Sequence, residues 1–206
     1  MSGSEPLFVT RLYRASLSGA AGKRLNRELD HACRLIAAED RAGQAWCRKH
    51  GYAGYTSYAS LDDLVVRSPE IAELARHLDR HVAMFARELD LELDRRKLAL
   101  DSIWINILEP GGVHAAHIHP HSVMSGTYYV AVPHGAGAIR FEDPRLGLMM
   151  AAPPRKSSAR RHNRTFVDVE PAPGTLLLWE SWLRHEVPLN RARRERISIS
   201  FNYGWR

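Results

Sequence analysis

Residues 103–132, IWINILEPGGVHAAHIHPHSVMSGTYYVAV, place four histidines between two runs of alternating apolar residues. His117 and His119 lie two residues apart, and side chains two apart on a β-strand point to the same face. Two imidazoles can therefore reach one metal ion from a single strand. Because a pair does not complete a metal site, the rest of the chain has to supply a further ligand.

The other histidines of the first two thirds of the chain carry weaker signals. His114 and His121 lie close to the pair, but only proximity selects them, so we expect supporting or surface roles. Pro120 should end the strand before His121, because proline cannot donate to a β-ladder. His77 and His81 lie four residues apart in a helical stretch with arginines beside them. This setting indicates helix-surface histidines.

Length and composition indicate one ordinary globular domain. The chain has 206 residues, of which 45% are apolar and 25% charged, as in soluble proteins with a single core. The sequence starts without a signal-peptide-like run and has no stretch of about 18 apolar residues. We therefore expect a cytoplasmic protein without a membrane span. Cys33 and Cys47 are too isolated to indicate a disulfide framework.

The net charge of +6 is concentrated in two short clusters, residues 155–164 and 191–196. A basic chain raises the question of nucleic-acid binding. Neither cluster has interleaved aromatic residues or a recognisable nucleic-acid motif. Solvated or substrate-facing loops are therefore favoured over a nucleic-acid partner.

The periodicity of apolar residues divides a single domain, 1–206, into a mainly helical part, 1–98, and a β-rich part, 99–206. Residues 20–39 and 68–90 have the i, i+3, i+4 spacing of amphipathic helices. A serine followed by proline at the start of the second stretch resembles an N-cap with proline at the first helical position.

Short alternating runs separated by glycine and proline follow the helices, which indicates a sandwich, jelly roll or barrel. They are residues 103–108, 127–132, 138–141, 165–169, 175–179 and 196–203. Residues 5–14 alternate as in a first strand. The fold class is then α+β, with N-terminal helices packed on a sheet. Residues 150–164 should form a long loop at the mouth of the barrel.

The last β run has two chemically different faces. Its polar face carries Arg196, Ser198, Ser200 and Asn202, and the residues between them are apolar or aromatic. An arginine beside hydroxyl groups suits a carboxylate, through charge-assisted and bidentate hydrogen bonds. His185 stands eleven residues before Arg196, directly after a buried-looking strand.

These pieces occur in the order found in Fe(II)/2-oxoglutarate-dependent oxygenases, which the chain resembles. The shared features are an HxH pair, a distal histidine and Arg-x-Ser on a terminal strand. HIHPHSVMSGTYYV (117–130) and ERISISFN (195–202) resemble more narrowly a bacterial branch with prolyl-hydroxylase-like relatives. The resemblance implies a double-stranded β-helix, a cupin-like jelly roll with the metal at its mouth.

For the metal, the resemblance implies Fe(II) ligands at His117 and His185. The usual triad has a carboxylate at the position of His119, so this chain departs from the pattern there. Three interpretations are open: a three-histidine iron site, a triad completed by Asp143 or Glu142, or a site for another metal. We favour the three histidines, because the narrower family carries HxH at this place.

For the cosubstrate, the resemblance implies that Arg196 binds the far carboxylate of 2-oxoglutarate. Ser198 or Ser200 should lie beside it. Tyr129 matches a tyrosine that helps to hold the same carboxylate in the prolyl-hydroxylase-like relatives.

The resemblance thus implies a non-haem Fe(II) dioxygenase that decarboxylates 2-oxoglutarate to succinate and hydroxylates an unidentified small-molecule or protein substrate, with dioxygen as co-reactant. A cupin-like metal-binding protein without oxygenase activity is the alternative, and it would not need Arg196 and Ser198. A nucleic-acid-binding domain is a weaker rival, because it would not need the histidines. An exposed sheet edge makes a homodimer the expected assembly.

Overall fold

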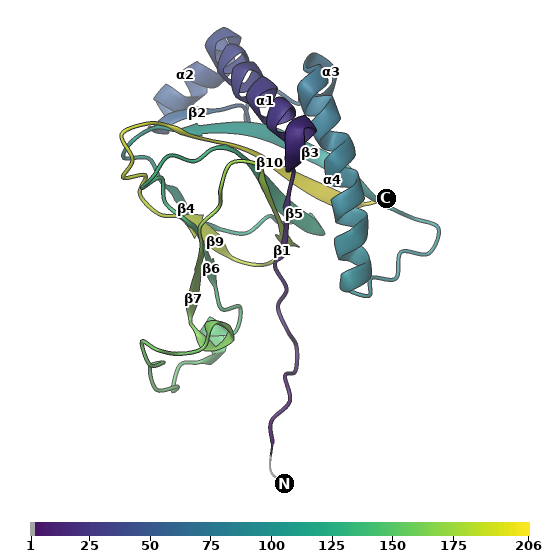
Figure 1. Cartoon of the computed structure of the whole chain (residues 1–206). Helices are drawn as coiled ribbons and strands as arrows, with labels where there is room; N and C mark the ends of the chain where they lie inside the picture. The colour runs from purple at the N-terminus through teal and green to yellow at the C-terminus, as the bar shows by residue number, and fades with distance from the viewer. Residues whose placement is uncertain (1–2) are drawn as a thin grey trace.

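The computed structural model describes residues 3–206 as two facing sheets, with helices covering the outer side of the larger one (Figure 1). The strands are β1 (Tyr13–Ser16), β2 (Gly54–Thr56), β3 (Leu98–Leu108), β4 (His114–His117), β5 (Met124–Ala131), β6 (Ile139–Glu142), β7 (Phe166–Val169), β8 (Thr175–Glu180), β9 (His185–Val187) and β10 (Arg196–Trp205). The larger sheet has the order β1-β8-β5-β10-β3-β2 and the smaller one β4-β9-β6-β7. This is the double-stranded β-helix that the family resemblance implies.

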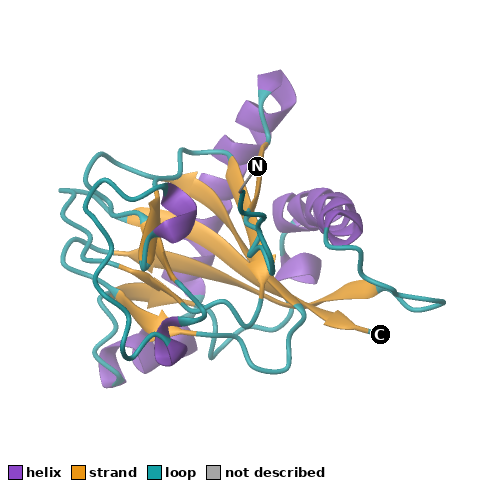
Figure 2. Ribbon diagram, turned by 90° about the horizontal axis from the view of Figure 1, so that it is seen from below, coloured by secondary structure: helices purple, strands orange, loops and turns teal. Residues whose placement is uncertain are grey.

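All six predicted β runs are strands, and two further short strands carry histidines. β4 and β9 pair with each other in the smaller sheet, which places His117 opposite His185. β3 begins at Leu98, earlier than its alternation indicates, because its first residues pair with the end of β10. Seen from below, the strands fill the centre of the molecule and the helices lie outside them (Figure 2).

Two long helices form where the apolar spacing predicts them: α1 (Gly19–Glu39) and α4 (Pro69–Glu88). Ser68 is the N-cap of α4, and its hydroxyl accepts a hydrogen bond from the Ile71 amide at 3.2 Å, as serine does at helix starts. Within residues 3–206, none of the helices combines the length and the apolar content that crossing a bilayer requires.

Two short helices were not predicted from the sequence: α2 (Arg41–Lys49) and α3 (Leu64–Arg67). Asp40 caps α2, since its Oδ1 accepts a hydrogen bond from the Gly43 amide. Its Oδ2 accepts from the hydroxyls of Tyr55 and Ser60. The cap therefore ties the end of α1 to β2 and to the segment that follows β2.

The predicted strand over residues 5–14 is wrong in its extent. Only Tyr13–Ser16 pairs, with β8, and residues 3–12 have no neighbouring strand in the described structure. Phe8 has a φ of +54° and is 98% exposed. Alternation alone does not make a strand when no partner satisfies the backbone groups.

The helices and the larger sheet share one hydrophobic core. Apolar side chains of α1 and α4, such as Leu29 and Phe85, pack on the outward face of the sheet, where Ile199 and Phe201 of β10 are fully buried. The polar face of β10 consequently points between the two sheets. A second, smaller cluster around Trp179 lies in that interior.

Candidate active site

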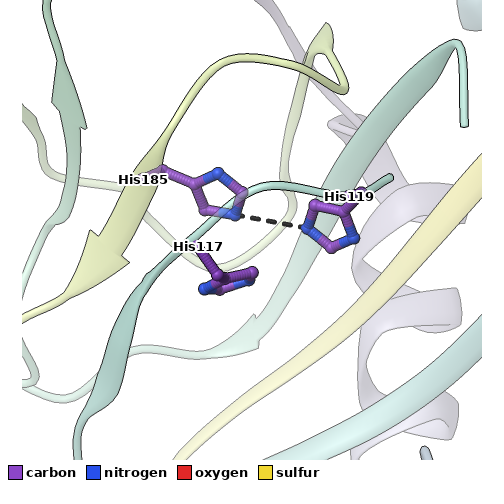
Figure 3. Close-up of side chains that lie close together, drawn as sticks. All are labelled: His117, His119 and His185. Atoms are coloured by element: carbon purple, nitrogen blue, oxygen red, sulfur yellow. Dashed lines mark hydrogen bonds between the residues drawn. The ribbon is translucent and has the colours of Figure 1, made fainter. Parts of the chain in front are cut away.

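Three histidines converge where β4 ends and β9 begins (Figure 3). One ring nitrogen each of His117, His119 and His185 lies within 4.8 Å of the others. The Nε2 atoms of His119 and His185 are 3.4 Å apart. Two imidazole nitrogens about 2.1 Å from one ion lie roughly 3 Å from each other. Within residues 3–206, this is the sole group of three potential metal ligands this close together.

Backbone carbonyls fix which nitrogen of two rings is free. Nδ1 of His117 lies 2.7 Å from the Ala115 carbonyl oxygen, and Nδ1 of His185 lies 2.9 Å from that of Leu183. Because a carbonyl only accepts, each Nδ1 carries the proton and donates it, leaving a lone pair on Nε2. Metal-binding histidines are commonly oriented in this way. Both rings are set to bind a metal through Nε2.

Burial keeps two of the rings neutral at physiological pH. It lowers the pKa of His185 to about 3 and the pKa of His119 to about 4. A histidine has to be unprotonated to bind a metal, so neither ring loses affinity to protonation near pH 7. His117 is exposed, and the cluster therefore opens directly on the surface.

His117 and His119 converge, but not as two residues of one strand. β4 ends at His117, and His119 reaches the cluster from the turn that follows. The amide of His119 donates to the Ser181 carbonyl at 3.0 Å, and the Ser181 hydroxyl bonds that of Ser125 at 2.7 Å. The turn that carries His119 is thus fastened to the segment after β8, which leads to His185.

The two carboxylates considered as alternative ligands lie outside the cluster. Asp143 pairs with Arg145 at 2.8 Å, and Glu142 pairs with Arg184 at 3.0 Å. His121 is exposed and sits in a turn with a φ of +68°. The residues that the fold brings together are therefore those of the three-histidine interpretation.

Arg196 lies inside the barrel at the start of β10. The residue is 1% exposed, and its Nε finds no hydrogen-bond partner among residues 3–206. The guanidinium carbon lies 5.0 Å from the ring centroid of Tyr129. A buried cation without an anionic partner is costly, which indicates that a ligand supplies the missing negative charge.

The two adjacent tyrosines of β5 point to opposite faces. Tyr128 reaches the helical side, where its hydroxyl donates to Asn26 Oδ1 of α1 at 3.0 Å. Tyr129 points inward, and its hydroxyl is buried without a partner among the described residues. Burial raises the pKa of Tyr129, so the phenol keeps its proton and can donate it to a bound oxygen.

Ser198 is better placed than Ser200 to bind a carboxylate together with Arg196. Ser198 is 1% exposed and lies opposite Tyr129 in the β5–β10 register. Ser200 is already engaged: its hydroxyl accepts from the Asn106 amide nitrogen at 3.2 Å and bonds Thr127 at 3.1 Å.

Two further residues lie near Arg196: His114, for which the sequence predicts a supporting or surface role, and Tyr52, which sequence reasoning missed. The hydroxyl of Tyr52 lies 2.7 Å from Nε2 of His114. Burial lowers the pKa of His114 to about 3, with a smaller contribution from the charge of Arg196. Tyr52 lies in the Gly- and Tyr-rich passage before β2, far from His114 in sequence, so no spacing rule could have joined them. Both groups are uncharged, so neither neutralises Arg196.

A third unpartnered donor lies near the histidines. Trp179 Nε1 is buried without a partner among the described residues, and the Trp179 ring is 4.7 Å from that of His185. Trp179 of β8 lies opposite Ser125 of β5. Ser125 is four residues before Tyr129, which is a separation of about 13 Å along a strand. Trp179 thus marks the histidine end of the interior, and Arg196 marks the other end.

Residues 102–202 match the family model described as “Putative 2OG-Fe(II) oxygenase”. The matched segment contains the three histidines and the polar face of β10. Residues 102–202 therefore belong to the 2OG-Fe(II) oxygenase family. No curated protein matches the chain.

Solved structures share the fold of this chain at low identity. A prolyl-4-hydroxylase from Pseudomonas putida is 19% identical, with 96% of this chain and 89% of that chain covered and a TM-score of 0.60. The α-ketoglutarate-dependent epimerase SnoN from nogalamycin biosynthesis is 16% identical over 95% and 76% of the two chains, with a TM-score of 0.64. HygX from Streptomyces hygroscopicus, solved with nickel, 2-oxoglutarate and hygromycin B, is 16% identical over 95% and 83%, with a TM-score of 0.61.

The interior of this oxygenase fits the cofactors of its family, Fe(II) and 2-oxoglutarate. Three imidazoles at one end suit a transition metal. A buried guanidinium and a protonated phenol at the other end suit a carboxylate. The unsatisfied donors are costly in the free protein, and a dicarboxylate lying along the interior would satisfy them.

Proposed function

We propose that His117, His119 and His185 hold the Fe(II) of this oxygenase. Support comes from the convergence of the three rings and from the Nδ1 hydrogen bonds that free Nε2 of His117 and His185. A three-residue set leaves positions open for the cosubstrate and dioxygen. Because His119 replaces the usual carboxylate, the site carries one negative charge fewer and also suits zinc, nickel or copper.

Arg196, with Tyr129 and Ser198, binds the far carboxylate of 2-oxoglutarate in this proposal. The observation that carries the assignment is the buried guanidinium without an anionic partner among the described residues. The uncharged pair of His114 and Tyr52 beside it leaves the positive charge for the ligand. Charge-assisted hydrogen bonds are the strong ones, so Arg196 should dominate cosubstrate affinity.

The reaction we propose is hydroxylation of a substrate C–H bond. When bound, Fe(II) and 2-oxoglutarate supply the oxidising power, since decarboxylation to succinate accompanies transfer of one oxygen atom of dioxygen to the substrate. The chain's own contribution is to orient and to exclude water. Tyr129 and Arg196 fix one end of the cosubstrate, and the buried cluster around Trp179 shields the side of the metal that faces the interior.

The experiment that tests the proposal is anaerobic absorption spectroscopy of the Fe(II) protein with metal analysis. A weak visible charge-transfer band that needs both iron and 2-oxoglutarate is expected. His185→Ala should lower the metal content and abolish the band, whereas His121→Ala, which removes an exposed histidine outside the cluster, should leave both unchanged. Tightly bound zinc and no band after iron exchange would favour a cupin-like metal-binding protein without oxygenase activity.

We further propose one domain, a cytoplasmic location and a homodimer. The helical and β-rich parts share one core, which supports a single domain. Cys33 and Cys47 are free, buried thiols, which suits a reducing compartment. β7 forms the outer edge of the smaller sheet, and such edges are suited to pairing with a second copy.

A further inference from the structure

The loop between β6 and β7, residues 143–165, holds almost all of the net charge. It contains six Lys or Arg residues and one acid, Asp143. The whole chain has 29 basic and 23 acidic residues, so removing 6 and 1 leaves 23 basic and 22 acidic residues elsewhere. The rest of the protein is therefore nearly neutral in sum, although residues 191–196 form a second, smaller basic cluster. Charge concentrated in one loop indicates a surface that attracts an anionic partner.

The acidic side chains near the base of the loop already form ion pairs with arginines that lie outside residues 155–164. The pairs are Arg145–Asp143 at 2.8 Å, Arg184–Glu142 at 3.0 Å and Arg140–Asp168 at 2.7 Å. The basic residues left over are exposed and form no ion pair with an acid in the described part of the chain: Arg155, Lys156, Arg160, Arg161 and Arg164. Arg164 also donates from Nε to the Ala159 carbonyl at 3.0 Å, and all five side chains can offer charged nitrogens to another molecule.

The loop leaves the barrel beside the metal centre. Phe141 of β6 lies opposite His185 of β9, with their rings 5.9 Å apart. Two residues later the loop begins, and its base is closed by the Asp143 amide donating to the Thr165 carbonyl at 2.8 Å. Figure 1 shows it extending outward from the ends of β6 and β7. A partner held by the loop would thus lie next to the histidines.

The chemistry of the loop disfavours nucleic acid. Residues 143–165 contain no Phe, Trp or Tyr, so they offer no platform on which single-stranded bases could stack. Their regular structure is limited to two three-residue 3₁₀ turns, Leu146–Leu148 and Arg161–Asn163. Such turns are too short to read a duplex groove.

Apolar side chains accompany the positive charge. Leu148 and Met150 in the loop are 88% and 93% exposed, and Ile118 and Trp182 at the mouth are 45% and 47% exposed. Exposed apolar groups beside basic ones suit an acidic polypeptide with apolar side chains, because methionine adapts to varied partners and aromatic side chains anchor interfaces. The exposed His117 shows that such a chain could reach the cluster without a lid opening.

We propose that the β6–β7 loop docks an acidic, partly apolar polypeptide segment, and that the substrate of this oxygenase is therefore a protein. The inference rests on the proposed function, since it assigns a substrate class to the same metal centre. The docked segment lies along the loop, and a neighbouring residue of the same polypeptide enters the mouth.

The test is fluorescence anisotropy of a labelled peptide of alternating Glu and Leu, titrated with the Fe(II)- and 2-oxoglutarate-loaded protein under anaerobic conditions. The variant R155Q/R160Q/R161Q should bind about tenfold more weakly, since three exposed ion pairs are each worth little. The charge-matched control R191Q/R193Q/R194Q removes exposed arginines from the loop before β10 and should change affinity by less than about twofold. L148S/M150S should weaken the Glu/Leu peptide but not an all-Glu peptide.

Three outcomes overturn the inference. Equal losses in the two arginine variants would show non-specific attraction to a basic protein. Tighter, loop-dependent binding of a single-stranded oligonucleotide or of phosphatidylserine vesicles would assign the loop to those partners instead. The charge-transfer band serves as an independent check. Its presence with no loop-dependent peptide binding refutes the docking surface alone, whereas its absence in the wild-type protein refutes the proposed function.

Discussion

The two faces of the larger sheet differ in how completely their polar groups are satisfied. On the helical face, the Tyr128 hydroxyl donates to Asn26 and the Tyr203 hydroxyl donates to Asp79 at 2.7 Å. On the inner face, Tyr129 and Arg196 are equally buried, yet each keeps a donor without a partner in the described part of the chain. Burial alone therefore does not separate a core from a ligand site.

The comparison shows which face of the sheet contributes mainly to stability and which contributes mainly to function. Apolar packing against α1 and α4 satisfies the helical face within the chain. The inner face is complete only with a ligand, because unpaired buried donors are costly. Substitutions on the helical face should therefore lower stability, whereas substitutions on the inner face should weaken cosubstrate binding.

The largest expected effect is on the helical face. Phe201→Ala removes a fully buried ring from the shared core and should lower the free energy of unfolding by about 3–5 kcal/mol. Urea denaturation measures this loss. Phe166→Ala, at a position that is 46% exposed, is the control and should cost much less. A loss below about 1 kcal/mol for Phe201→Ala would contradict the assignment of this face to the core.

The next effect is on the inner face and concerns binding. Arg196→Met should weaken 2-oxoglutarate binding about 100-fold, which corresponds to about 2.7 kcal/mol, and leave the metal content near normal. The free energy of unfolding of the ligand-free protein should not fall, because the substitution removes a buried charge whose Nε has no hydrogen-bond partner among residues 3–206. Titration of the charge-transfer band measures affinity. Loss of the metal in this variant would argue against a role limited to the cosubstrate.

The third effect in size is a loss of stability in acid, and it arises on the inner face. The pKa of His114 is lowered to about 3 by burial and by Arg196, against an ordinary value near 6.5. Below pH 6.5 the unfolded chain binds a proton at His114 that the folded protein does not bind, so stability falls as the pH falls.

The loss from His114 reaches about 2 kcal/mol at pH 5. Urea unfolding of the metal-free protein at pH 7 and pH 5 measures it. His114→Gln should shrink the loss by about that amount, and His121→Gln, which replaces an exposed histidine, should not. An unchanged loss in His114→Gln would show that this histidine is not held neutral by the fold.

The smallest effect comes from the neighbouring tyrosines of β5. Tyr128→Phe breaks the hydrogen bond to Asn26 and should cost about 1 kcal/mol of stability without changing 2-oxoglutarate affinity. Tyr129→Phe should cost no stability, because its hydroxyl has no partner to lose in the described structure, but should weaken 2-oxoglutarate binding several-fold. Identical behaviour of the two variants in both assays would remove the distinction between the faces.

Much of the β-rich part was predictable from local pattern. The alternation of β10 separates Arg196 and Ser198 from Ile197 and Ile199, and the structure keeps that separation. The cap at Ser68 was predictable because a helix start depends on adjacent residues. The extent of the strand expected over residues 5–14 was not predictable, because a strand exists only where a partner strand pairs with it.

The sequence by itself determined the chemistry of this protein: which residues are histidine, arginine or tyrosine, and which face of a strand each occupies. Tertiary structure alone decided which of them meet. His119 reaches His185 because its turn is fastened to Ser181, and Tyr52 reaches His114 across separate elements. Periodicity encodes only the direction of a side chain along its own strand. Contacts between distant segments depend on pairing and packing of the whole chain, which no local pattern contains.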